Sequence, residues 1–125
     1  MKGGDNLKSK IYTSYFANLR NIPNSLEPIA VSLFTPSFYN GKRAIDLAPS
    51  KEILNDYKSG KIDENEYKMR YLDLLSDRAE SLSDWCDYFE KNEVVLVCYE
   101  GKDKFCHRHI LGELLKDIGF EVVEF

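Results

Sequence analysis

The spacing of apolar residues predicts the secondary structure of the last quarter of the chain. The uninterrupted apolar, β-branched run 94–97 is typical of a strand buried on both faces. Apolar residues then recur at helical spacing between residues 110 and 118, and Gly119 follows as a helix end. Residues 120–125 are again β-branched and aromatic. This order predicts a βαβ unit whose two strands are parallel, with a right-handed crossover.

Weaker patterns in the earlier part of the chain complete an α/β fold. Strands are predicted over 10–16 and 29–34, loops over 17–28 and 36–49, and helices over 51–59, from 63 to about 75, and near 78–91. Ser50 and Asp63 are good helix N-caps, and Gly60 is a good helix end. The chain is therefore expected to form a small single α/β domain over residues 10–125, with helices flanking a mostly parallel sheet.

Composition and charge narrow the function classes. A length of 125 residues suits one domain, and a net charge of −4 argues against a general nucleic-acid-binding protein, which is normally basic. No apolar run reaches the roughly 20 residues that span a bilayer. Residues 1–9 lack the apolar core of a signal peptide and are expected to be a flexible lead. Three cysteines without a secretory signal predict free thiols in a cytoplasmic protein.

Chemically capable side chains gather just after the buried strand at 94–97. In α/β folds, ligands bind at the carboxyl ends of strands, beside a helix N-terminus. The cluster contains both histidines and two of the three cysteines of the chain. Its members are Cys98, Glu100, Cys106, His107, Arg108 and His109.

The first interpretation of this cluster is an enzyme site for a small anionic ligand, phosphorylated or nucleotide-like. The first turn of a helix offers unpaired N–H groups and a positive dipole end, which bind anions and favour the thiolate form of a cysteine. The expected catalytic residues are Cys106 as nucleophile, His107 as acid or base, and Glu100 as orienting carboxylate. The expected ligand-binding residues are Arg108 as anion clamp, Cys98, and the opposite wall of Tyr39, Lys42 and Arg43. A small anionic molecule is thus the expected partner, rather than a membrane or a nucleic acid.

Three other interpretations of the cluster stay open. Cys98, Cys106, one histidine and Glu100 are a possible set of metal ligands, although their spacing fits no standard zinc motif. A disulfide between Cys98 and Cys106 would make a redox switch if the intervening loop folds back, since the two Cα atoms must come within about 7 Å. Alternatively, an ion pair between Glu100 and Arg108 only joins the sheet to the helix. The chain has no dinucleotide fingerprint, P-loop or Cys-x5-Arg loop, so the cofactor stays unknown.

The same residues carry a resemblance to a known family. Cys98-Tyr99-Glu100 followed by Phe105-Cys106-His107-Arg108 resembles the signature of the bacterial and phage family catalogued as domain of unknown function 488. Further matches are IYTSYFANL at residues 11–19, Leu47-Ala48-Pro49-Ser50, Tyr57-Lys58 and Glu66-Tyr67. The resemblance implies a compact α/β fold and a cytoplasmic protein, without an established reaction. Longer relatives tend to carry Asp-Val-Arg after the second strand, where this chain has Val31-Ser32-Leu33, so no role of that motif is carried over.

Overall fold

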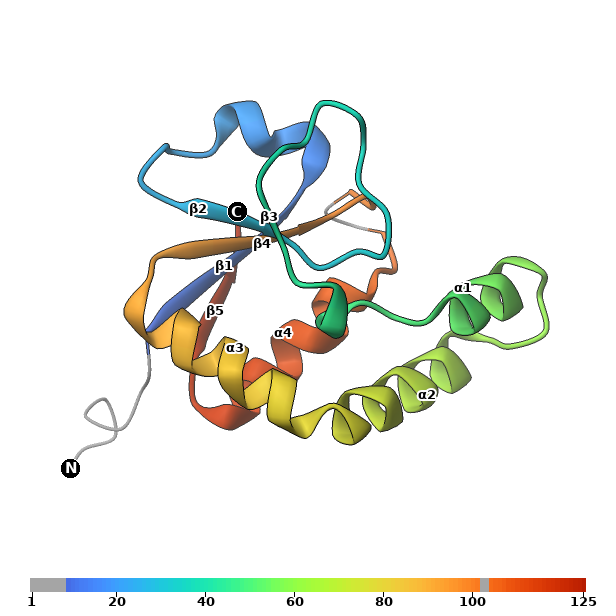
Figure 1. The fold of residues 1–125 in the computed structure, drawn as a ribbon. Helices are drawn as coiled ribbons and strands as arrows, with labels where there is room; N and C mark the ends of the chain where they lie inside the picture. Colours follow the sequence, from blue (N-terminus) through green and yellow to red (C-terminus); the bar gives the residue numbers. More distant parts are fainter. Residues whose placement is uncertain (1–8, 102–103) are drawn as a thin grey trace.

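Five parallel strands form a single sheet in the computed structural model, which describes residues 9–101 and 104–125 (Figure 1). The expected lead at residues 1–9 lies outside the described residues, apart from Ser9. The strands are β1 (Lys10–Tyr15), β2 (Glu27–Ala30), β3 (Lys42–Arg43), β4 (Val94–Cys98) and β5 (Glu121–Glu124). Their order across the sheet is β3-β2-β4-β1-β5, with every neighbouring pair parallel.

Helices and turns cover both faces of this sheet. The helices are α1 (Lys51–Lys58), α2 (Glu64–Asp77), α3 (Ala79–Lys91) and α4 (His107–Ile118), with short 3-10 helices at Phe16–Asn21 and Ile45–Leu47. On the face covered by α2, α3 and α4, Val94 and Leu96 of β4 join the larger core cluster. On the other face, Val95 and Val97 pack with Phe16 and its neighbours. The central strand is thus buried on both sides, as the apolar run predicts.

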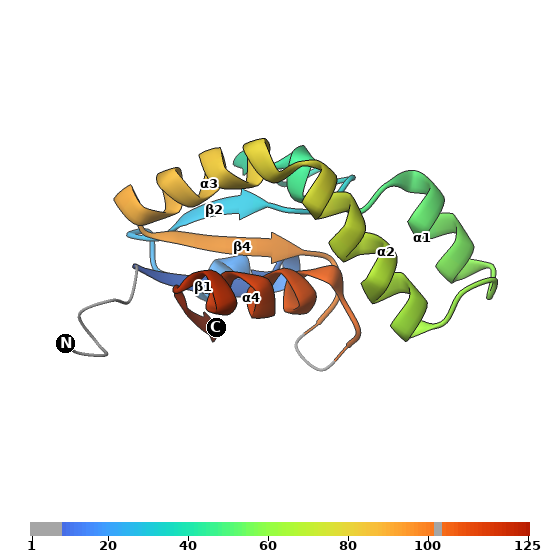
Figure 2. The same cartoon turned by 90° about the horizontal axis from the view of Figure 1, so that it is seen from below.

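The pair α1–α2 extends beyond the sheet on the side to which the strands point. Figure 2 shows the arrow of β4 directed towards the end of the molecule where α1 and α2 lie. The predicted caps of these helices are confirmed: Ser50 Oγ accepts from the Ile53 N–H at 3.2 Å, and Asp63 Oδ1 from the Glu66 N–H at 2.9 Å. These helices are therefore placed beside the carboxyl ends of the strands.

The predicted α/β fold is confirmed, and the structure corrects its details. The strands β4 and β5 are parallel, but β1 lies between them. The strand predicted at 29–34 is β2, which begins two residues earlier and ends at Ala30. The N–H groups of β2 point alternately to β4 and to β3. Pro28, which has no N–H, lies on the β3 side, and it is tolerated there because β3 begins only opposite Ile29. The two-residue β3 falls within the predicted loop 36–49, because a Lys-Arg pair carries no apolar pattern.

The C-terminal helix contains a glycine that the packing does not require. Gly119, at a φ of 125°, ends α4 as predicted. Gly112, inside α4, is expected from the sequence to permit close approach to a strand. In the structure, however, a methyl group at this position would meet only Val122 Cγ1 at 3.4 Å, which is ordinary contact. Replacing Gly112 with alanine should therefore raise the free energy of unfolding by about 0.5–1 kcal/mol, because alanine loses less backbone entropy in a helix. Urea unfolding of the two proteins would measure this, and a loss of stability would show that the Val122 contact is too tight.

Among the described residues, no helix combines the length and the apolar character needed to cross a membrane.

Candidate active site

A pocket of about 560 Å³ opens at the carboxyl end of β4, between the start of α4 and the α1–α2 pair. Four of the predicted site residues line it, and they are Cys98, Glu100, Cys106 and His107. The rest of the lining is mostly apolar and aromatic: Ser32, Leu33, Phe34, Pro49, Leu54, Tyr57, Lys58, Tyr67, Tyr99 and Phe105. The pocket therefore lies where the α/β architecture predicts a site.

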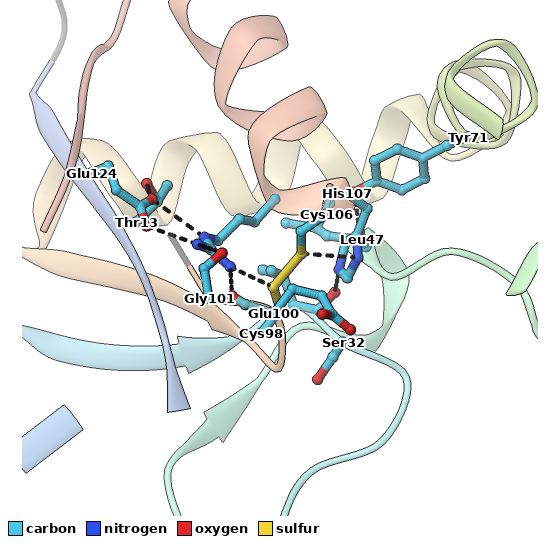
Figure 3. Close-up of a disulfide and its surroundings, with 12 residues drawn as sticks. Thr13, Ser32, Leu47, Tyr71, Cys98, Glu100, Gly101, Cys106, His107 and Glu124 are labelled. Atoms are coloured by element: carbon cyan, nitrogen blue, oxygen red, sulfur yellow. Dashed lines mark hydrogen bonds and ion pairs between the residues drawn. A yellow bond between two sulfur atoms is a disulfide. The ribbon is translucent and has the colours of Figure 1, made fainter. Parts of the chain in front are cut away.

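The two cysteines of the pocket are joined as a disulfide (Figure 3). Cys98 is the last residue of β4, and Cys106 is the N-cap of α4. The prediction of free thiols is therefore wrong for this pair. The Cα atoms of the two cysteines lie 7.8 Å apart. The third cysteine, Cys86, lies on α3 and is buried in the hydrophobic core.

His107 is buried, and its two ring nitrogens have different partners. Nε2 lies 2.6 Å from the Val31 carbonyl oxygen, which only accepts, so Nε2 carries the hydrogen. Nδ1 then holds the lone pair, and it lies 3.8 Å from Cys106 Sγ. Burial lowers the pKa of His107 to about 4, against the raising effect of the Val31 carbonyl and together with the nearby charge of Arg108. The imidazole is therefore neutral at neutral pH, with its acceptor nitrogen facing the sulfur.

Arg108 is fully buried at 0 % exposure, and its guanidinium is saturated by contacts within the protein. It pairs with the Glu124 carboxylate through Nε at 3.3 Å and Nη2 at 2.7 Å. Nη2 also donates to the Gly101 carbonyl at 3.2 Å, while Nη1 donates to the Glu100 carbonyl and lies 3.0 Å from Cys98 Sγ. These contacts occupy all five N–H donors of an arginine.

Two expectations about Arg108 are therefore corrected. Arg108 is not among the pocket-lining residues, so the structure does not place it as a clamp for a bound anion. Its carboxylate partner is Glu124 on β5, whereas Glu100 contributes only its backbone carbonyl. The guanidinium lies behind the pocket and ties α4 to β4 and β5.

The lining of this pocket does not include Tyr39, Lys42 or Arg43, which were expected to form its opposite wall. The Tyr39 hydroxyl contacts the backbone of β2, accepting from the Ala30 N–H at 3.1 Å, and burial raises its pKa to about 12. Lys42 Nζ lies 5.1 Å from the centre of the Tyr88 ring. Arg43 Nη2 donates to the Leu33 carbonyl at 2.9 Å. All three contacts hold β3 and its turn against the body of the protein.

The opposite wall comes instead from α1, α2 and Phe105. The rings of Tyr57, Tyr67 and Phe105 pack against one another with centroids 5.0–5.3 Å apart. Lys58, at the end of α1, adds a cation to the lining. Helical spacing places Tyr57 and Tyr67 on the apolar faces of their helices, but it does not distinguish a core face from a pocket wall. The pair Tyr57-Lys58 is one of the sequence matches to the family, and this match was a signal that pointed to the wall made by α1 and α2.

The contacts of this site do not assemble a metal centre. Within residues 9–101 and 104–125, no group of three or more histidine, cysteine, aspartate or glutamate side chains is placed to hold a metal ion. The Nε2 atom of His107 is directed at the Val31 carbonyl, and the two sulfur atoms at each other. In this structure these three donor atoms are thus directed at other protein atoms.

Comparison with known proteins identifies the family of this chain. A family model described as "Active DUF488-N3 subclade" matches residues 35–119, which is more than half of the chain and includes the Cys98 to Arg108 segment. Among curated proteins and among solved structures, none matches the chain. The chain belongs to the domain of unknown function 488 family, within its active N3 subclade.

Proposed function

We propose that the protein is an enzyme that binds a small anionic, nucleotide-like molecule in this pocket and uses Cys106 as its nucleophile. The observation that carries the proposal is the position of His107, whose acceptor nitrogen lies 3.8 Å from Cys106 Sγ while its other nitrogen is fixed by the Val31 carbonyl. A thiol beside a base that is oriented by a third group is the usual arrangement of an activated nucleophile.

In the reduced protein, Nδ1 of His107 is placed to accept a hydrogen bond from the Cys106 thiol. The tautomer fixed by Val31 leaves Nδ1 unprotonated, and the low pKa keeps it so at neutral pH. Cys106 is also the N-cap of α4, where the helix dipole stabilises negative charge on sulfur. The sulfur lines the pocket, so a bound molecule can reach it.

The other side of the pocket supports the choice of ligand. Aromatic rings such as Tyr57 and Phe105 offer flat apolar faces on which a nucleobase stacks. Lys58 lies at the same wall and supplies the positive charge that an anionic group needs, which Arg108 does not. Glu100 is exposed and lines the pocket, so it is placed to contact a polar group of the ligand. The description of the family as active also supports an enzyme.

The proposal is tested by the alkylation rate of Cys106 in reduced protein at pH 7. Iodoacetamide would be the reagent, and mass spectrometry of the Cys106 peptide the measurement. Replacing His107 with asparagine should slow alkylation several-fold, because the thiol loses the ring nitrogen that accepts its hydrogen bond. A panel of nucleoside monophosphates should protect Cys106 in the wild type, and Lys58→Ala should weaken this protection.

Cys86 provides an internal control, since it is buried in the core away from the pocket lining and should label equally slowly in every variant. An unchanged rate in His107→Asn would remove the nucleophile–base pair. Protection by nucleotides together with an unchanged rate would make the protein a binding module rather than an enzyme.

A further inference from the structure

We propose that Cys98 and Cys106 form a reversible redox couple with different roles for the two sulfurs. Cys106 exchanges with a low-molecular-weight disulfide that enters the pocket. Cys98 then closes the internal disulfide, and Arg108 stabilises the Cys98 thiolate. This inference rests on the proposed function. Its consequence is that the internal disulfide removes the Cys106 nucleophile.

The environments of the two sulfur atoms differ in access. Cys106 precedes α4 and is 5 % exposed, whereas Cys98 is held in the sheet opposite Tyr15 and is 1 % exposed. Both line the pocket, and Cys98 also contacts the guanidinium of Arg108. A disulfide molecule in the pocket therefore meets Cys106 first.

The two sulfur atoms also differ in their polar partners. Cys106 Sγ lies 3.8 Å from the acceptor nitrogen of His107, which can take the proton of an attacking thiol. Cys98 Sγ lies 3.0 Å from Nη1 of Arg108, a buried cation that cannot leave without losing its other partners. A cation at this distance forms a charge-assisted hydrogen bond with a thiolate. Stabilising a thiolate makes it the better leaving group when the disulfide is attacked.

The exchange balances in two steps. The Cys106 sulfur loses its proton along its hydrogen bond to His107 as it attacks one sulfur of the external disulfide, whose S–S bond breaks, and the thiolate that is released takes up this proton. The Cys98 thiol gives its proton to water, and its thiolate attacks the Cys106 sulfur. This step forms the internal disulfide and releases the second external thiolate, which takes up a proton from water. The two cysteines are oxidised by two electrons and the external disulfide is reduced to two thiols. Excess external thiol reverses both steps, with attack on Cys106 and departure of the Cys98 thiolate.

The roles of the two cysteines are tested with oxidised glutathione and reduced protein. The variant Cys98→Ser should accumulate a mixed disulfide with glutathione on Cys106, because nothing resolves it. The variant Cys106→Ser should form a mixed disulfide on Cys98 at least about tenfold more slowly, since Cys98 lacks the base and the access. The wild type should end as the internal disulfide, seen by mass spectrometry as the loss of two hydrogens, and Cys86→Ser should behave as the wild type.

The part played by Arg108 is tested at equilibrium with Glu124→Gln, which keeps the size of the partner and removes its negative charge. The guanidinium then interacts more strongly with the Cys98 thiolate. At a fixed ratio of reduced to oxidised glutathione, the equilibrium constant between the disulfide and the dithiol protein should therefore shift several-fold towards the dithiol form. A purely structural Arg108 would leave this ratio unchanged.

Equal rates of mixed-disulfide formation at the two sulfur atoms, or a wild type that stays as two thiols under excess oxidised glutathione, would overturn the redox couple. The exchange needs no nucleotide, and nucleotide protection is measured on reduced protein. Each proposal can therefore fail while the other stands.

Discussion

Replacing Arg108 with leucine should lower the free energy of unfolding by about 3–5 kcal/mol, because it leaves the partners of a buried cation without their donor. Glu124 would keep a carboxylate that is only 18 % exposed with no guanidinium beside it. The carbonyls of Glu100 and Gly101 would also lose their hydrogen bonds. Urea unfolding under reducing conditions, followed by circular dichroism, would measure the change.

Arg70 offers a matched control for this substitution. It pairs with Asp56 at 2.9 Å and with Glu52 at 3.2 Å, but its side chain is 27 % exposed. The same change to leucine there should cost much less stability, because water replaces the lost partner. The double variant Arg108→Leu with Glu124→Leu should recover part of the loss, since no lone buried charge remains. Similar losses at positions 70 and 108 would show that the guanidinium of Arg108 is not essential to the fold.

Lowering the pH from 7 to 5 should cost about 2 kcal/mol of stability through His107 alone. Its pKa is about 4 in the folded protein against an ordinary value of 6.5, so as the pH falls the unfolded chain takes up a proton first. The stabilisation is present above pH 6.5, falls through the range from 6.5 to 4, and is lost below about 4. Unfolding curves in urea at several pH values would show this slope.

The variant His107→Asn separates this effect from the titration of carboxylates, which both proteins share. It should be less stable at pH 7, since the Tyr71 ring loses its contact with the imidazole, whose centroid is 5.6 Å away. Between pH 7 and 5, however, it should lose about 2 kcal/mol less than the wild type. Parallel curves for the two proteins would mean that His107 takes up its proton in the folded state as readily as in the unfolded one.

The sequence was sufficient for the central strand, for the helix that follows it and for the place of the pocket. The run 94–97 has one plausible structure, a strand buried on both faces, and the glycine at 119 fixes the end of the helix that follows. The carboxyl end of that strand and the start of that helix must then lie together, whatever the rest of the chain does. This is why Cys98, Cys106 and His107 were found together from their positions alone.

The opposite wall and the role of Arg108 depend on contacts between segments distant in sequence. The partner of Arg108 is Glu124, 16 residues later in the chain, whereas the partner expected from the sequence was Glu100. The loop that carries Tyr39, Lys42 and Arg43 was assigned to the site because of its aromatic and basic residues. Its direction, however, is set by β3 pairing with β2 on the edge of the sheet, and no local pattern encodes that pairing.

The position of β1 between β4 and β5 has a consequence for how the protein folds. Ile11 lies opposite Val94 on one side and Val122 on the other. β5 therefore joins the rest of the sheet only through β1, which lies more than 80 residues before β4 in the sequence. Helices and turns form quickly from local contacts, whereas closing so long a loop delays the pairing. We therefore expect a kinetic order in which α1, α2 and α3 are formed before β1 enters the sheet. Until it does, β4 and β5 each expose an unpaired edge, and crowded unfolded chains are most prone to aggregate through these edges.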